Sequence, residues 1–125
     1  MVFIPAIKIL LVDDDKDMCD SLKDIFSLVK GTKIKCSTSP IKSLELIKKN
    51  NFDLVFVDYK MPKMNGVELI KKILEIKPDT HIFMLTAFIS NNLINEAQAA
   101  GAKKVLSKFI WPDELIKIIE NYQNK

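Results

Sequence analysis

The sequence alternates five times between a short apolar run and a longer segment with helical spacing, and this alternation constrains the fold most. The runs have the length of strands, and the segments after them repeat apolar residues three and four positions apart. Strands that alternate with helices through short connections form a parallel sheet with helices on both faces. We therefore predict an α/β fold. The expected strands are residues 8–12, 32–36, 54–57, 81–85 and 104–107.

The expected helices begin and end at recognisable capping residues. The first begins near Lys16, where Asp14 or Asp15 can cap it, and its apolar period continues to Val29. Gly31 is expected to end this helix. The other expected helices are residues 40–49, 66–76, 91–100 and 112–122.

Polar side chains follow four of the five apolar runs, at the point where each run ends. Asp13 and Asp14 follow the first run, Asp58 the third, Thr86 the fourth and Lys108 the fifth. Because the carboxyl ends of parallel strands share one edge of the sheet, we expect these side chains to converge on one crevice. Clustered carboxylates repel one another, and either a raised pKa or a bound cation relieves this repulsion. Their hard oxygen atoms favour Mg²⁺ or Ca²⁺.

Asp58 is the best placed of these carboxylates to react. It follows residues 54–57, four apolar residues that suit a strand buried on both faces, whereas Asp14 lies at a helix start. The nearby ammonium and hydroxyl would suit a tetrahedral oxyanion, and a carboxylate can accept a phosphoryl group as an aspartyl-phosphate. The alternative is that Asp58 only starts a turn, where aspartate is common.

The acidic segment after the first run also matches part of a calcium-binding EF-hand loop. Asp13, Asp15 and Asp17 fall at its first, third and fifth ligand positions. However, Met18 stands where that loop needs glycine, and Asp24 stands where it needs glutamate. Helical spacing also begins inside the segment, so we disfavour this alternative.

Composition limits the classes of partner and compartment. All nineteen basic residues are lysines, so the forked guanidinium donors that read bases are missing. This weakens a sequence-specific DNA-binding function and leaves loose electrostatic association open; we expect no direct binding of nucleic acid by this chain. No apolar stretch approaches the roughly 18 residues of a membrane helix, and residues 1–7 lack the basic start and cleavage site of a signal peptide. Cys19 and Cys36 lack metal-binding spacing, so we expect two free, packed thiols in a cytoplasmic protein.

Several short motifs occur together in the order and spacing of one family. They are Leu11-Val12-Asp13-Asp14, Val57-Asp58-Tyr59-Lys60-Met61-Pro62, Met64-Asn65-Gly66, Leu85-Thr86-Ala87, Gly101-Ala102 and Lys108. Over essentially its whole length the chain resembles the receiver domain of bacterial response regulators. The resemblance implies a flavodoxin-like doubly wound fold, with a five-stranded parallel sheet in strand order 2-1-3-4-5 and five helices. It also implies a single receiver domain over residues 1–125, and we expect no output domain in this chain.

The resemblance implies that Asp58 is the phosphoacceptor. It would take a phosphoryl group from the phosphohistidine of a sensor histidine kinase or a phosphotransfer protein. Mg²⁺ would be the cofactor, bound by Asp14, Asp58 and the backbone carbonyl of Lys60, with Asp13 acting largely through a water molecule. The chain would be no enzyme beyond phosphorylating and dephosphorylating itself.

The resemblance also implies how the phosphoryl group is read. Lys108 would pair with its oxygen atoms, the Thr86 hydroxyl would hydrogen-bond one of them, and Ala87 would be small enough to leave it room. Thr86 would then move inward, and the face of the fourth helix, fifth strand and fifth helix would rearrange to control a partner protein or a linked output domain. Lys60 and Phe88 would flank the site, where bulky Phe88 is expected to slow hydrolysis.

Three residues depart from the family pattern. Phe109 stands where the family usually has a proline after Lys108, often in a cis bond, which costs about 2.5–4 kcal/mol without proline. Val105 replaces the usual switch aromatic, for which Phe109 or Trp111 could substitute. Trp111 could instead anchor a partner protein, or pack locally over residues 104–107.

Two other functions stay open from the sequence. The intact acidic residues, Thr86 and Lys108 argue against a phosphorylation-independent protein-binding pseudo-receiver, but Val105 and Phe109 keep this alternative open. A magnesium-dependent, phosphatase-like enzyme would use an aspartyl intermediate, but Lys60 stands where such enzymes keep a second acid. His81, the only histidine, lies at a strand entrance, and we expect it to be structural.

Overall fold

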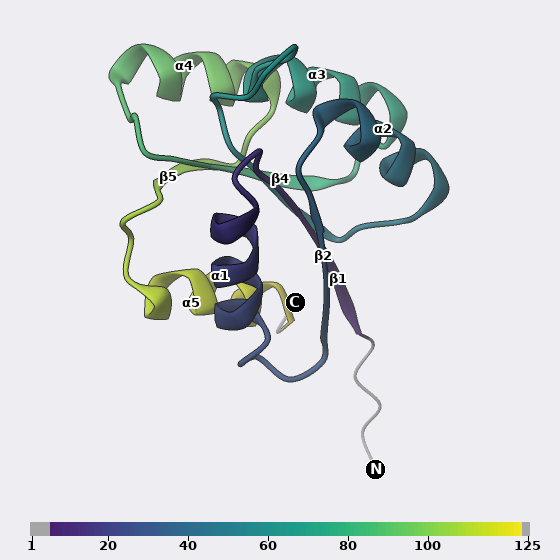
Figure 1. Ribbon diagram of the computed structural model, residues 1–125, viewed down its shortest axis with the longest axis vertical. Helices are drawn as coiled ribbons and strands as arrows, with labels where there is room; N and C mark the ends of the chain where they lie inside the picture. The colour runs from purple at the N-terminus through teal and green to yellow at the C-terminus, as the bar shows by residue number, and fades with distance from the viewer. Residues whose placement is uncertain (1–5, 124–125) are drawn as a thin grey trace.

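The computed structural model describes residues 6–123 and is a parallel β-sheet covered by helices on both faces (Figure 1). The elements, in chain order, are β1 (Ile7–Val12), α1 (Lys16–Phe26), β2 (Thr32–Ser37), α2 (Pro40–Lys49), β3 (Leu54–Val57), α3 (Gly66–Ile76), β4 (His81–Thr86), α4 (Asn91–Ala100), β5 (Lys104–Ser107) and α5 (Pro112–Gln123). The five strands lie in the order β2-β1-β3-β4-β5, so the predicted fold and strand order are confirmed.

The helices form two layers with the sheet between them. Figure 1 shows α2, α3 and α4 on one face and α1 and α5 on the other. Every residue of the central strand β3 is buried, because both of its faces are covered. Phe56 of β3 lies between Phe26 and Phe83, with ring centroids 4.9 Å and 5.2 Å away. This aromatic row fills the core beneath α1 and α5.

Capping residues define several of the helix ends. The side chains of Asp15, Ser39 and Ser90 accept hydrogen bonds from backbone N–H groups at the starts of α1, α2 and α4. Gly101 ends α4 in the left-handed conformation, at φ +117°.

The predicted end of α1 at Gly31 is wrong. The helix ends at Phe26, where the Ser27 N–H and hydroxyl both donate to the Lys23 carbonyl. The chain then makes a turn through Val29 and Gly31, and Gly31 enters β2 at φ +82°. Val29 is still buried, because it packs into the core from the turn. The helical spacing of apolar residues therefore continues to Val29, beyond the end of the helix itself.

The strand register brings the carboxyl ends of the strands to one edge of the sheet. Val12 of β1 pairs with Val57 of β3, and Thr86 of β4 pairs with Ser107 of β5. The residues that follow these strands are therefore neighbours in space. The longest described helix, α5, has 12 residues, so no helix within residues 6–123 can cross a membrane.

Candidate functional site

Three carboxylates meet at the carboxyl edge of the sheet. Asp13 and Asp58 are buried, at 3% and 7% exposure, and Asp14 beside them is exposed. One oxygen atom from each of the three lies within 4.8 Å of the others. Lys108 Nζ lies 2.7 Å from Asp13 Oδ2 and 3.0 Å from Asp58 Oδ2, so one ammonium pairs with both buried carboxylates. The structure thus brings these four predicted residues together.

Backbone hydrogen bonds hold these residues at the strand ends. The Asp58 N–H donates to the Val12 carbonyl at 2.9 Å, and the Lys108 N–H donates to the Thr86 carbonyl at 3.0 Å. Asp13 Oδ1 accepts from the Asp15 N–H at 2.9 Å, which fixes the carboxylate at the start of α1. Backbone hydrogen bonding between neighbouring strands thus continues one residue past the ends of β3 and β5. It holds Asp58 and Lys108 at the carboxyl edge of the sheet.

Burial and charge act against each other at this site. Burial raises the pKa of Asp58 above its ordinary value, although Lys108 favours the charged form and Asp13 opposes it. Burial alone would lower the pKa of Lys108, but the Asp13 and Asp58 carboxylates together raise it. The site therefore holds excess negative charge in a poorly solvated place, and a second cation would relieve it.

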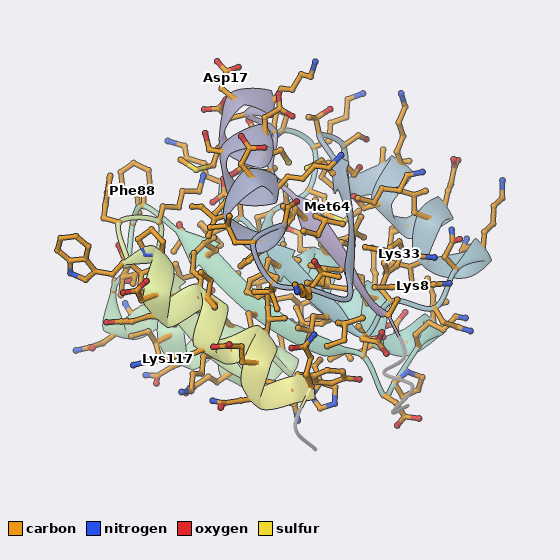
Figure 2. All side chains as sticks on the ribbon, turned by 90° about the horizontal axis from the view of Figure 1, so that it is seen from below. Lys8, Asp17, Lys33, Met64, Phe88 and Lys117 are labelled. Carbon is orange, nitrogen blue, oxygen red and sulfur yellow. The ribbon has the colours of Figure 1, made fainter. Side chains whose placement is uncertain are left out.

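Thr86 and the residues after it line the rim of the site. Thr86 is fully buried, and its Oγ1 accepts a hydrogen bond from the Phe88 N–H at 3.3 Å. Ala87 is exposed between them. Phe88 is 66% exposed, lies at the outer edge of the molecule in Figure 2, and has Lys60 Nζ 5.6 Å from its ring centroid. Lys60 and Phe88 are thus in contact, which their separation in sequence did not reveal.

Gly66 has a steric role that the sequence analysis did not identify. A β-carbon there would collide with the backbone carbonyl of Asp58, so only glycine lets the start of α3 approach the site so closely. The Gly66 N–H donates to the Tyr59 carbonyl at 2.7 Å, and Asn65 caps the helix. The Asn-Gly dipeptide after the apolar run was the available signal for this tight loop.

The residues that depart from the family pattern lie in different surroundings. Val105 is half-buried and packs against the core beneath α2, α3 and α4. Phe109 and Trp111 are 81% and 77% exposed, so the alternative that Trp111 packs locally over β5 is wrong. Residues 6–123 contain no cis peptide bond, so Lys108–Phe109 is trans.

Two other predictions concerned the cysteines and the histidine. Cys19 and Cys36 are free thiols, as predicted, and burial raises the pKa of the Cys19 thiol to about 12. His81 packs edge-on against the Tyr122 ring, with centroids 5.3 Å apart, at the end of the sheet opposite the carboxylates.

Comparison with known proteins identifies the family. The response regulator receiver domain model matches residues 9–120 of the chain. The chain belongs to the response regulator receiver family. Receiver domains are signalling domains of two-component systems, and the carboxylates described above lie within the matched range.

Individual receiver proteins support the same conclusion. The chemotaxis protein CheY of Thermotoga maritima is 31% identical over 112 residues, which cover 90% of this chain and 93% of CheY. The transcriptional regulatory protein YhcZ of Bacillus subtilis is 32% identical over 111 residues, 88% of this chain but 52% of YhcZ, so the chain spans about half of that relative. A CheY-like receiver domain protein from Methanospirillum hungatei has a TM-score of 0.88 at 28% identity, covering 95% of this chain and 94% of that one.

Proposed function

We propose that Asp58 accepts a phosphoryl group from the phosphohistidine of a sensor histidine kinase or phosphotransfer protein. The observation that carries this proposal is the single Lys108 ammonium between the buried Asp13 and Asp58 carboxylates, at the edge of the sheet. In the transfer, the phosphorus–nitrogen bond to histidine breaks as a phosphorus–oxygen bond to Asp58 forms. Phosphoryl transfer mainly needs positioning and charge neutralisation, and these residues provide both.

The donor set around Asp58 fits a Mg²⁺ ion. The carboxylates of Asp14 and Asp58 would hold it together with the backbone carbonyl of Lys60, and Asp13 would act largely through a water molecule. Hard oxygen donors and a solvent-facing Asp14 suit an ion that keeps some of its water. When bound, Mg²⁺ would neutralise charge on the phosphoryl oxygens and on the carboxylates.

Lys108 and Thr86 would then bind the transferred group. Lys108 can turn from the carboxylates to the new phosphoryl oxygens, because its present partners include the acceptor itself. The Thr86 hydroxyl now accepts from the Phe88 N–H, and moving inward to donate to a phosphoryl oxygen would break that bond. Exposed Ala87 would leave space for the group.

We propose that this exchange controls the face formed by α4, β5 and α5. Loss of the Thr86–Phe88 hydrogen bond would free the loop before α4, while Lys108 connects the site to the loop before α5. Val105, Phe109 and Trp111 lie on this face, and the two exposed aromatic side chains could anchor a partner protein. The phosphoryl group would thereby shift the population between two packings of one domain.

Incubation with a small-molecule phosphodonor and Mg²⁺, followed by intact-mass measurement, tests this function. We expect one added phosphoryl group in the natural protein and none in the Asp58→Asn variant. Asp53→Asn, which changes a carboxylate at the opposite end of the sheet, is the matched control and should still be modified. An adduct that persists in Asp58→Asn, or none in the natural protein with donor in excess, would contradict the proposal.

The second candidate is a receiver that binds its partner without phosphorylation. Exposed Phe109 and Trp111 favour it, because their surface is available before any modification. In that case the protein would show no adduct, and a partner would bind natural protein and Asp58→Asn equally well. Sustained turnover of phosphate esters would instead indicate a phosphatase-like enzyme.

A further inference from the structure

Strand β2 is an edge of the sheet with an open side. Among residues 6–123 it pairs with β1 alone, and alternate backbone groups of an edge strand point outward. Among residues 6–123, no hydrogen bond outside the β1–β2 ladder involves the backbone of residues 33–36. This stretch therefore offers unpaired donors and acceptors to another strand.

The same edge carries a concentration of lysines. Lys8 pairs in register with Lys33, and Lys35 lies on the same face because strand side chains alternate. All three are exposed, and Figure 2 shows Lys8 and Lys33 side by side. We call Lys8, Lys33, Lys35, Lys42 and Lys49 the basic edge.

A groove beside β2 extends this basic edge towards α2. It has a volume of about 380 Å³, and Lys35, Lys42 and Lys49 line it together with apolar Cys36 and Leu46. Of the described residues that line it, Glu45 alone is acidic. With Glu45 counted, the basic edge still carries a net positive charge.

The lysines determine which strands can pair here. Lysine on an edge strand discourages pairing with another copy of the same strand, because like charges would stand opposite each other. The same charges favour a strand whose facing residues are acidic, since opposite charges on neighbouring strands attract. The unpaired backbone groups favour an extended strand, and the lysines favour one with acidic side chains.

We propose that β2 binds an extended acidic segment of a partner protein as an added strand of the sheet. Alternate acidic side chains of that segment lie beside Lys33 and Lys35, on the α2 side of the sheet. The intervening side chains lie beside half-buried Ile34 and Cys36, where β-branched apolar residues fit. The site is at the edge of the sheet away from β5 and does not involve Asp58, so this inference stands independently of phosphoryl transfer.

Fluorescence anisotropy with a labelled peptide of alternating sequence, Thr-Glu-Val-Glu-Val-Glu-Thr, tests the proposal on the full chain. We expect saturable binding that weakens as salt is raised. In Lys33→Glu/Lys35→Glu, affinity should fall about tenfold, because each opposed pair contributes a few-fold. The variant should instead bind the matching peptide with lysine in place of glutamate. Lys71→Glu/Lys72→Glu on exposed positions of α3 makes the same charge change away from β2 and should bind the acidic peptide nearly as the natural protein does.

Changes to the peptide separate strand addition from simple charge attraction, and they use the natural protein throughout. N-methylation of the alternate backbone nitrogens that face β2 removes strand hydrogen bonds without changing charge, so we expect binding to be lost. Equal binding of the N-methylated peptide, or equal weakening by the α3 control, would overturn the proposal. Tighter binding of a single-stranded oligonucleotide of the same charge would also overturn it, in favour of a general polyanion surface.

Discussion

The two ends of the sheet both hold an aspartate, but they stabilise it in different ways. At the carboxyl end, buried Asp58 shares one Lys108 ammonium with Asp13. At the amino end, half-buried Asp53 accepts hydrogen bonds from the Lys8 N–H at 2.9 Å and the Tyr122 hydroxyl at 3.2 Å. The first end depends on charge balance and can exchange its partner for another charged group, whereas neutral donors satisfy the second. The first is thus suited to signalling and the second to joining β1, β3 and α5.

The largest expected effect is from Lys108→Met, which keeps much of the side-chain volume and removes the ammonium. We expect the free energy of unfolding at neutral pH to fall by about 3 kcal/mol, because two buried carboxylates lose their common partner. Urea denaturation measures this free energy of unfolding. Exposed Lys103→Met is the control and should leave stability nearly unchanged.

Lys108→Met also has an expected dependence on pH. The loss in the free energy of unfolding should become smaller as acid protonates Asp58. Adding Asp58→Asn to Lys108→Met should recover part of this free energy at neutral pH. If Lys108→Met has the same free energy of unfolding as the natural protein, then charge balance does not stabilise the carboxyl end of the sheet, and this difference between the two ends is lost.

Tyr122→Phe should have a smaller effect at the amino end. It removes the hydrogen bond to Asp53 and should lower the free energy of unfolding by about 1 kcal/mol. Tyr59→Phe is the matched control, because residues 6–123 provide no hydrogen-bond partner for the Tyr59 hydroxyl. A larger loss in Tyr59→Phe would contradict the role assigned to Tyr122.

Raising the pH should lower the free energy of unfolding through both ends of the sheet. Although burial opposes it, the carboxylates raise the pKa of Lys108 above its ordinary 10.5. Burial and Asp53 raise the pKa of Tyr122 above its ordinary 10.0. The stability that each group contributes is present below its ordinary pKa and is lost as pH rises through the raised, folded-state value. The urea midpoint of unfolding, measured from neutral pH to above these values, should show this loss. The loss due to Tyr122 should be absent in Tyr122→Phe, and the loss due to Lys108 should be absent in Lys108→Met.

The smallest expected effect concerns Phe88, and it depends on the proposed phosphorylation. Phe88→Ala should speed loss of the phosphoryl group about threefold, because it removes the contact with Lys60 that covers the rim of the site. Loss of a cation–π contact of ordinary strength changes a rate by a few-fold. Mass measurement after removal of the donor gives the rate. Ile89→Ala, at the neighbouring exposed position, should leave it unchanged. An unchanged rate in Phe88→Ala would show that the rim does not control hydrolysis.

The sequence allowed the convergence of the charged side chains to be predicted because these residues follow strand ends. Asp58 follows a fully apolar run and Lys108 follows another, and parallel pairing brings such ends together whatever the details of packing. The end of α1 was harder to predict, because Val29 continues the apolar period from a turn. The contact of Lys60 with Phe88 joins two loops and leaves no local pattern.

The sequence by itself determined the order of strands and helices along the chain and the acidic residues at the strand ends. These depend on local periodicity and on residue types with a strong conformational preference. Only the tertiary structure decided that Lys108 lies between two buried carboxylates, that Gly66 must lack a side chain, and that Trp111 is exposed. It also gathered Lys8, Lys33 and Lys49 onto one edge. Distances between residues far apart in the chain depend on register and packing, which a local pattern does not contain.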